Sequence, residues 1–159
     1  MVSNLELFSQ LDLHSRCEEQ IANETDRNLP YAGMILQCET LKRRYINCLH
    51  RPVGPTGKYN CHGLTFASRR TAMEGPAVEK LLSEDDYTEV TIDMVLPGDI
   101  VIYRSGPDVR HSGIVVRGFP ELLILSKWGT AHEAIHGVDD CPYQGYKTFY
   151  RITDEPPRL

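Results

Sequence analysis

Cys61 stands in a setting that suits a nucleophile. It lies in the segment Lys58-Tyr59-Asn60-Cys61-His62-Gly63-Leu64, directly after the Gly- and Pro-rich stretch 51–57, and a helix is expected to begin at it. The first turn of a helix carries free N–H groups and a partial positive charge, which favour a thiolate and lower the pKa of a cysteine. The same N–H groups can stabilise the oxyanion of a tetrahedral intermediate. The sequence therefore offers Cys61 as a candidate nucleophile.

A thiol that attacks a carbonyl group needs a base, and His111 is a candidate for that role. It follows the polar loop 104–110 and directly precedes the apolar run 112–116, which we expect to form a strand. Its imidazole is therefore expected at the rim of a sheet. If residues 118–120 join two antiparallel strands, the partner of His111 lies near Ser126, Lys127 or Trp128.

A second motif competes with this pair. His132-Glu133-Ala134-Ile135-His136 matches H-E-x-x-H, in which two histidines one helical turn apart bind zinc and the glutamate acts as general base. Gly129 and Gly137 leave room for barely two helical turns around the motif, and few residues follow it to supply a third ligand. We therefore keep a zinc peptidase as an alternative and expect a polar segment beside the cleft, with no cofactor or metal.

The elements that must position these residues change in type along the chain. The first half has helical spacing of apolar residues over 3–21 and 31–48, and a third helix is expected over 61–72. The second half has short apolar or β-branched runs at 99–103, 112–116 and 122–125, and an alternating run at 146–152. Helices followed by strands predict an α+β domain with N-terminal helices packed on one face of a small antiparallel sheet.

Three segments in order resemble the motif blocks of the NlpC-like and CHAP cysteine peptidases and amidases. They are 60–64 around the cysteine, 96–103 with its Pro-Gly-Asp turn, and 111–116 with the histidine. The resemblance implies a papain-like fold, with Cys61 as nucleophile and His111 as base. Segment 124–130 is similar to the papain strand that carries Asn-Ser-Trp-Gly, and matching the Trp-Gly pair puts Ser126 where the orienting Asn would be.

The identity of the third residue stays open, because serine holds an imidazole more weakly than an amide or a carboxylate does. His132, Glu133 and His136 are the alternatives to Ser126. The resemblance also implies a peptide or amide substrate, with peptidoglycan stem peptides as one class. A catalytically inactive binding domain with the same fold is a further alternative.

Length and charge limit the number of domains and the classes of binding partner. The 159 residues suit a single domain, divided into a helical part at 1–54 and an NlpC-like catalytic core at 55–152. A net charge of −5 gives no general attraction to nucleic acid or to anionic membranes, and no apolar run is long enough to span a bilayer. The start of the chain lacks the features of a secretory signal, so we expect a cytoplasmic protein or one exported by another route.

Overall fold

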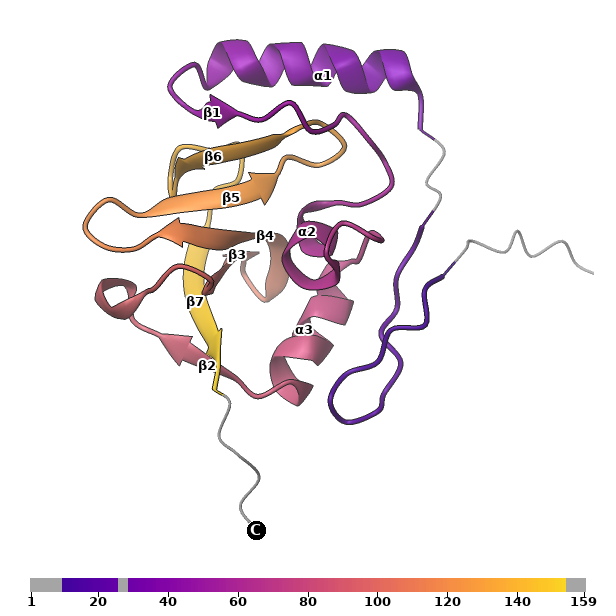
Figure 1. Ribbon diagram of the computed structural model, residues 1–159, viewed down its shortest axis with the longest axis vertical. Coiled ribbons are helices and arrows are strands. Elements are labelled where there is room, and N and C mark those ends of the chain that lie inside the picture. The colour runs from indigo at the N-terminus through magenta and orange to yellow at the C-terminus, as the bar shows by residue number, and fades with distance from the viewer. Residues whose placement is uncertain (1–9, 26–28, 154–159) are drawn as a thin grey trace, which may run out of the picture.

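The structure, a computed structural model, describes residues 10–25 and 29–153. Its centre is a seven-stranded sheet in which every pair of neighbouring strands is antiparallel (Figure 1). The strands are β1 (Leu49–His50), β2 (Tyr87–Val90), β3 (Ile100–Ser105), β4 (Asp108–Arg117), β5 (Leu123–Lys127), β6 (Glu133–Gly137) and β7 (Tyr146–Ile152). Their spatial order is β1-β6-β5-β4-β3-β7-β2.

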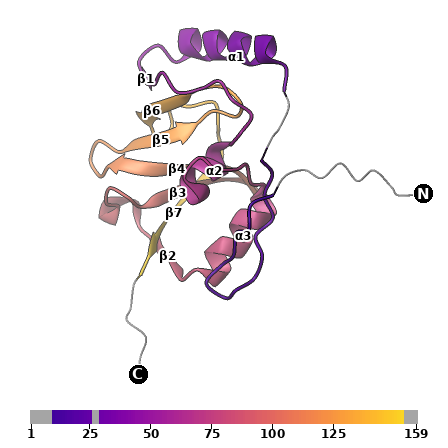
Figure 2. The ribbon, with the colours of Figure 1, turned by 45° about the vertical axis from the view of Figure 1, so that its right-hand side comes forward.

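The described residues also form α1 (Tyr31–Arg44), α2 (Cys61–Ala67), α3 (Gly75–Glu84) and a short 3-10 helix, Ile92–Met94. Figures 1 and 2 show α2 and α3 close together beside the middle of the sheet, and α1 at its far end next to β1 and β6. Both α2 and α3 pack against β4. The helix that begins at Cys61 is therefore held against the strand that carries His111.

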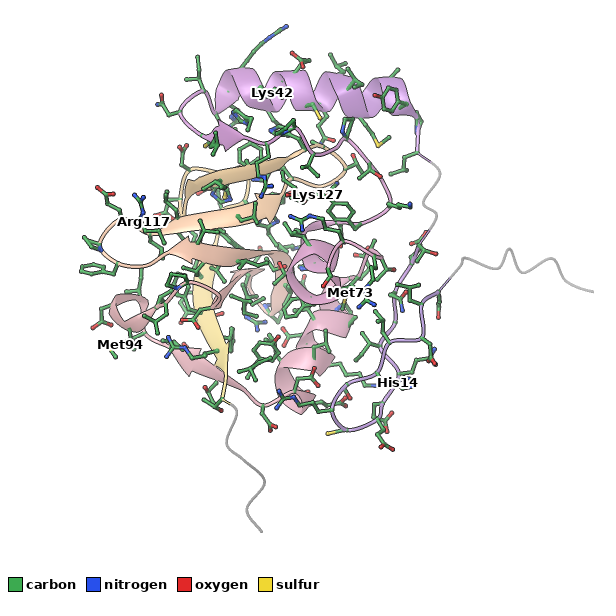
Figure 3. All side chains as sticks on the ribbon, in the orientation of Figure 1. His14, Lys42, Met73, Met94, Arg117 and Lys127 are labelled. Atoms are coloured by element: carbon green, nitrogen blue, oxygen red, sulfur yellow. The ribbon has the colours of Figure 1, made fainter. Side chains whose placement is uncertain are left out.

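Apolar side chains cover both faces of the central strands. Successive residues of a strand point to opposite faces, so Val101 of β3 packs in a core with Trp128 while its neighbour Ile100 packs with Val78 of α3. Helix α1 contributes Cys38 to the first of these cores. Figure 3 shows side chains filling the space between the helices and the sheet on each side.

The predicted fold class, helices packed on one face of a small sheet, is wrong. The sheet has seven strands, because β1, β2 and β6 join the four strands that apolar runs had indicated. Apolar runs in the sequence do not indicate these three strands, because β1 and β2 are short and because β6 carries Glu133 on one face and His136 on the other. Residues on both faces are buried, so the helices do not form a single layer.

The N-terminal helix predicted over 3–21 is also wrong from Gln10 onward, while 3–9 lie outside the described residues. The chain is extended and folds back on itself, with the N–H of Ile21 donating to the carbonyl of Leu13 over 2.7 Å. The amide side chain of Asn23 donates to the carbonyl of Leu11 and accepts from its N–H, each at 2.9 Å. A polar side chain that binds backbone groups in this way stabilises an alternative to the helix.

Other predicted elements are present, but some of them end at other residues than expected. Helix α1 begins directly after Pro30 as expected but ends at Arg44, and α2 begins at Cys61 but ends at Ala67, since Ser68 takes a left-handed conformation with φ 49°. Helix α3 was not predicted. The strands expected over 99–103, 112–116, 122–125 and 146–152 are confirmed as β3, β4, β5 and β7.

Candidate active site

The start of α2 is fixed by the side chain of Asn60. Its Oδ1 accepts hydrogen bonds from the N–H of Gly63 at 3.0 Å and of Met73 at 3.2 Å, and its Nδ2 donates to the carbonyl of Met73 at 2.6 Å. The first of these is an N-cap bond, which satisfies a free donor of the helix. Asn60 therefore positions the residue that follows it, Cys61, against the segment that leads into α3.

A chain of hydroxyl groups holds α2 against β4. The hydroxyl of Ser112 donates to that of Thr65 at 3.0 Å, and the Thr65 hydroxyl donates to the carbonyl of Cys61 at 2.9 Å. Nδ1 of His62 lies 2.8 Å from the same Ser112 hydroxyl. Ser112 directly follows His111, so these bonds hold the start of α2 against the strand that carries the candidate base.

The thiol of Cys61 is only 5% exposed. Burial raises its pKa to about 11, although the backbone N–H groups of Ser112 and His62 act in the opposite direction. Cys61 is therefore a neutral thiol at physiological pH. It borders a polar cavity of about 250 Å³, whose other walls include Glu74, Arg110 and Tyr143.

His111 is fully buried, and neither of its ring nitrogens has a hydrogen-bond partner among the described residues. Burial lowers its pKa well below the usual value for histidine, and the neighbouring His62 and His136 act in the same direction. The imidazole is therefore neutral. Burying an imidazole whose two nitrogens lack hydrogen-bond partners costs free energy. A role in catalysis is one explanation for such a residue.

Tyr143 holds the ring of His111. The two rings are stacked with centroids 3.6 Å apart and planes 5° apart, while Tyr103 contacts the imidazole edge-on at 5.2 Å. Tyr143 also lines the cavity at Cys61, and burial, followed by the nearby Cys61, raises the pKa of its phenol. Tyr143 was not predicted, since a single tyrosine in a loop after Pro142 belongs to no motif.

Ser126 does not form a hydrogen bond to His111 in the described part of the chain. Its hydroxyl lies 2.7 Å from Nε2 of His136, whose Nδ1 lies 2.7 Å from the carbonyl of Gly137. A carbonyl only accepts, so Nδ1 of His136 carries the proton and Nε2 accepts from Ser126. The orienting role of Ser126 stays a prediction, and its hydroxyl proton is already engaged by His136.

The H-E-x-x-H segment lies in and next to β6, where the zinc motif requires a helix. Residues four apart on a strand are separated by about 13 Å, too far for His132 and His136 to share one ion. Each has another partner, since Nε2 of His132 lies 2.7 Å from Nδ1 of His50. Among the described residues no group of three or more His, Cys, Asp or Glu side chains could hold a metal ion.

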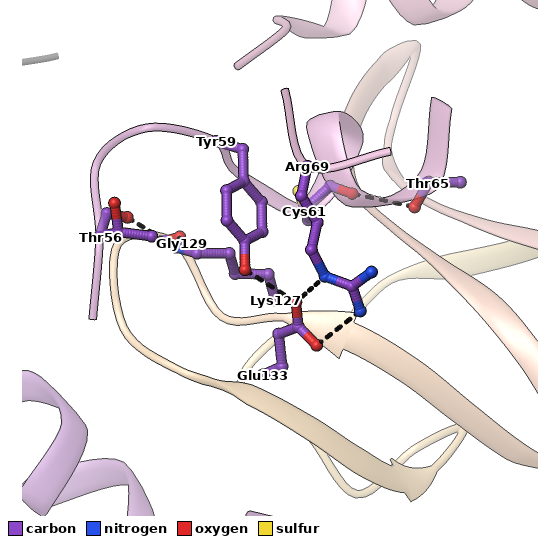
Figure 4. Close-up of polar contacts among 8 residues, drawn as sticks. All are labelled: Thr56, Tyr59, Cys61, Thr65, Arg69, Lys127, Gly129 and Glu133. Atoms are coloured by element: carbon purple, nitrogen blue, oxygen red, sulfur yellow. Dashed lines mark hydrogen bonds and ion pairs between the residues drawn. The ribbon is translucent and has the colours of Figure 1, made fainter. Parts of the chain in front are cut away.

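Glu133 points to the face of β6 opposite to that of His136, and its buried carboxylate organises a charged cluster (Figure 4). Its carboxylate accepts from Nε of Arg69 at 2.5 Å, from Nη2 of Arg69 at 3.0 Å and from the hydroxyl of Tyr59 at 2.7 Å. Burial alone would raise the pKa of Glu133, but these hydrogen bonds outweigh it and hold the pKa below its usual value.

Lys127 completes this group, which we call the Glu133 cluster and define as Tyr59, Arg69, Lys127 and Glu133. Nζ of Lys127 donates to the carbonyls of Thr56 at 2.9 Å and Gly129 at 2.6 Å, and it lies 5.0 Å from the centre of the Tyr59 ring. The cluster ties the loop that precedes Cys61 to β5 and β6. None of its members was predicted in this role.

Comparison with protein-family models, with curated proteins and with solved structures gives no match. Within residues 10–25 and 29–153, no helix combines the length and the apolar character needed to cross a membrane.

Proposed function

We propose that this protein is a cysteine hydrolase that cleaves an amide bond, with Cys61 as nucleophile and His111 as base. One observation carries the proposal. Tyr143 stacks on the buried His111 imidazole, whose ring nitrogens have no hydrogen-bond partner among the described residues, and it lines the same cavity as Cys61. The likeness of segments 60–64, 96–103 and 111–116 to the NlpC-like and CHAP motifs supports the same assignment.

The reaction begins with a neutral pair, because burial favours the uncharged form of both Cys61 and His111. As the sulfur attacks the substrate carbonyl carbon, the thiol proton moves to a ring nitrogen of His111 and a C–S bond forms. The carbonyl oxygen becomes an oxyanion, which the N–H groups beside Cys61 stabilise. When the C–N bond breaks, His111 returns the proton to the leaving amine.

The second half of the reaction releases the acyl group. Water attacks the thioester while His111 accepts a proton from it, the C–S bond breaks, and the proton returns to the sulfur as the carboxylic acid leaves. In both halves the imidazole must keep one orientation. Stacking against Tyr143 supplies that orientation, since no residue in the described part of the chain hydrogen-bonds to the ring nitrogens, so Tyr143 is a positioning residue in this proposal.

The substrate class that we propose is a peptide or another amide. The cavity at Cys61 is lined by side chains that can hydrogen-bond to a peptide backbone, among them Asn60, Arg110 and Thr130. Peptidoglycan stem peptides are the class that the motif resemblance favours, and they contain both peptide bonds and charged groups that would meet Arg110 and Glu74.

Cys61→Ala tests the proposal directly. Purified protein is incubated with a library of short peptides and with peptidoglycan fragments, and new amino termini are identified by mass spectrometry. We expect the native protein and a Cys17→Ser control, which changes an exposed thiol outside the site, to cleave equally, and Cys61→Ala to leave every substrate intact. Cleavage that survives Cys61→Ala would refute the proposal.

A catalytically inactive binding domain is the second candidate, and the burial of the Cys61 thiol together with its raised pKa favours it. This alternative predicts that the native protein cleaves nothing in the same assay while it still retains particular peptides. Cleavage that depends on Cys61 would exclude it.

A further inference from the structure

A second cavity lies beside the first and has a different character. It has a volume of about 360 Å³ and a mostly apolar surface. Its lining comes from the N-terminal segment, from the residues that lead into α3 and from the start of α3, namely Gln10, Ala22, Asn23, Glu24, Ala72, Met73, Glu74, Pro76 and Ala77. Small side chains such as Ala22, Ala72 and Ala77 leave the space open. The cavity therefore suits an apolar group about as large as a leucine or phenylalanine side chain.

The two cavities are neighbours. Glu74 lines both of them, with Gly75 on the side of Cys61 and Pro76 on the apolar side. Asn60, which precedes Cys61, is hydrogen-bonded through its side chain to both backbone groups of Met73, in the lining of the apolar cavity. A chain that reaches Cys61 can therefore place a side chain in the apolar cavity within a few residues.

The outer wall of the apolar cavity is firmly held. The Asn23 side chain, which is buried, makes hydrogen bonds to Leu11, Ile21 and Thr71, each between 2.9 and 3.0 Å. Next to it, Glu24 and Ala72 exchange two backbone hydrogen bonds of 2.8 Å. The N-terminal segment is thus attached to the catalytic part of the protein at the position where it closes the cavity.

We infer that the apolar cavity is a substrate subsite, in which the N-terminal segment 10–25 forms the wall that receives an apolar side chain of a peptide substrate. The inference rests on the proposed function and specifies its substrate as a peptide with an apolar residue within three positions of the cleaved bond. Carboxylates of Glu24 and Glu74 at the cavity disfavour an acidic residue there. The N-terminal segment is therefore part of the specificity of the enzyme.

The test is to fill the cavity from its rim. Ala22 is exposed and lines the cavity, so Ala22→Trp reduces the space without entering the core, and Ala32→Trp on the exposed face of α1 is the matched control. Cleavage of a peptide library by the native protein should show a preference of about tenfold or more for an apolar over an acidic residue at one position near the cut. Ala22→Trp should remove most of that preference, and Ala32→Trp should keep it.

The outcomes separate the two proposals. Cleavage that depends on Cys61 but shows no apolar preference, or a preference that Ala22→Trp leaves unchanged, would overturn the subsite and leave the proposed function intact. No cleavage that depends on Cys61 would overturn the proposed function, and the subsite with it. Thermal unfolding of both Trp variants shows that a changed preference is not caused by loss of the fold.

Discussion

Two buried polar groups, Glu133 on β6 and His111 on β4, differ in their hydrogen-bond partners. In the Glu133 cluster, the buried carboxylate has three hydrogen-bond donors, and the ammonium group of Lys127 has two carbonyl acceptors. At His111, which is equally buried, neither ring nitrogen has a partner among the described residues. The Glu133 carboxylate and the Lys127 ammonium group therefore have hydrogen-bond partners without a ligand, whereas the ring nitrogens of His111 have none among the described residues. This contrast is the reason why we propose a chemical role for His111 and expect the Glu133 cluster to serve stability.

His111→Leu should produce the largest effect on activity and little effect on stability. Removing a general base costs about 10²–10⁴-fold in rate, and more where the residue acts with its nucleophile as a unit. Leucine fills a similar volume without a buried unpaired nitrogen, so the free energy of unfolding should stay equal or rise. Peptide cleavage and urea unfolding measure the two quantities. A large loss of stability would show that His111 is structural, and it would contradict the difference proposed between His111 and the Glu133 cluster.

Glu133→Gln should show the opposite pattern. It leaves the Arg69 guanidinium without its anionic partner, and we expect unfolding to become easier by about 2–3 kcal/mol, less than for a fully buried pair because Arg69 is partly exposed. Asp108→Asn is the control, since its pair with Arg110 lies at the surface and should contribute about 0–1 kcal/mol. Urea unfolding of both variants checks this, and equal effects would contradict the special role of the cluster.

Tyr143 tests how His111 is oriented. Tyr143→Leu removes the stacked ring, and we expect kcat to fall about 10–100-fold, because small displacements of a catalytic group are costly. Tyr143→Phe keeps the ring and should restore kcat to within about threefold of the native value, since aromatic stacking does not need the hydroxyl. KM should change little in either variant. Equal losses in the two variants would assign the effect to the hydroxyl instead.

The last expected effect appears only at acid pH. Burial lowers the pKa of His132 to about 4, below the ordinary value of 6.5. The unfolded chain therefore binds a proton from about pH 6.5 downward while the folded protein does not, so His132 lowers stability as the pH falls from 6.5 to 4 by about 1.4 kcal/mol per pH unit. His132→Gln should reduce the slope of unfolding free energy against pH by about that amount. An unchanged slope would show that His132 titrates normally.

The central strands and the start of α2 could be predicted from sequence, because each depends on a local pattern. Apolar runs predict β3 and β5, and the Gly- and Pro-rich loop before Cys61 predicts the start of α2. The seven-stranded sheet could not be predicted, since β1 and β6 pair through backbone groups that are the same in every residue. Helical spacing in the N-terminal segment was misleading because Asn23 binds the backbone across the chain.

Residues that support the site were the hardest to predict. Glu133 belongs to a zinc-peptidase motif in the sequence, yet its contacts with Tyr59 and Arg69 depend on residues far away in the chain. Tyr143 reaches His111 from a loop, and only the complete fold brings the two rings together. Chemistry that needs a particular residue type leaves a local signal, whereas the packing that orients that residue does not.

The position of β7 has a consequence for how the chain folds during synthesis. This strand contains residues 146–152, yet it lies between β3 and β2, which are made much earlier. Until β7 leaves the ribosome, β2 has no partner strand and β3 has an open edge on that side. Completion of the sheet must therefore wait for the last part of the described chain, and shortened chains that end before Tyr146 should expose strand edges that invite aggregation.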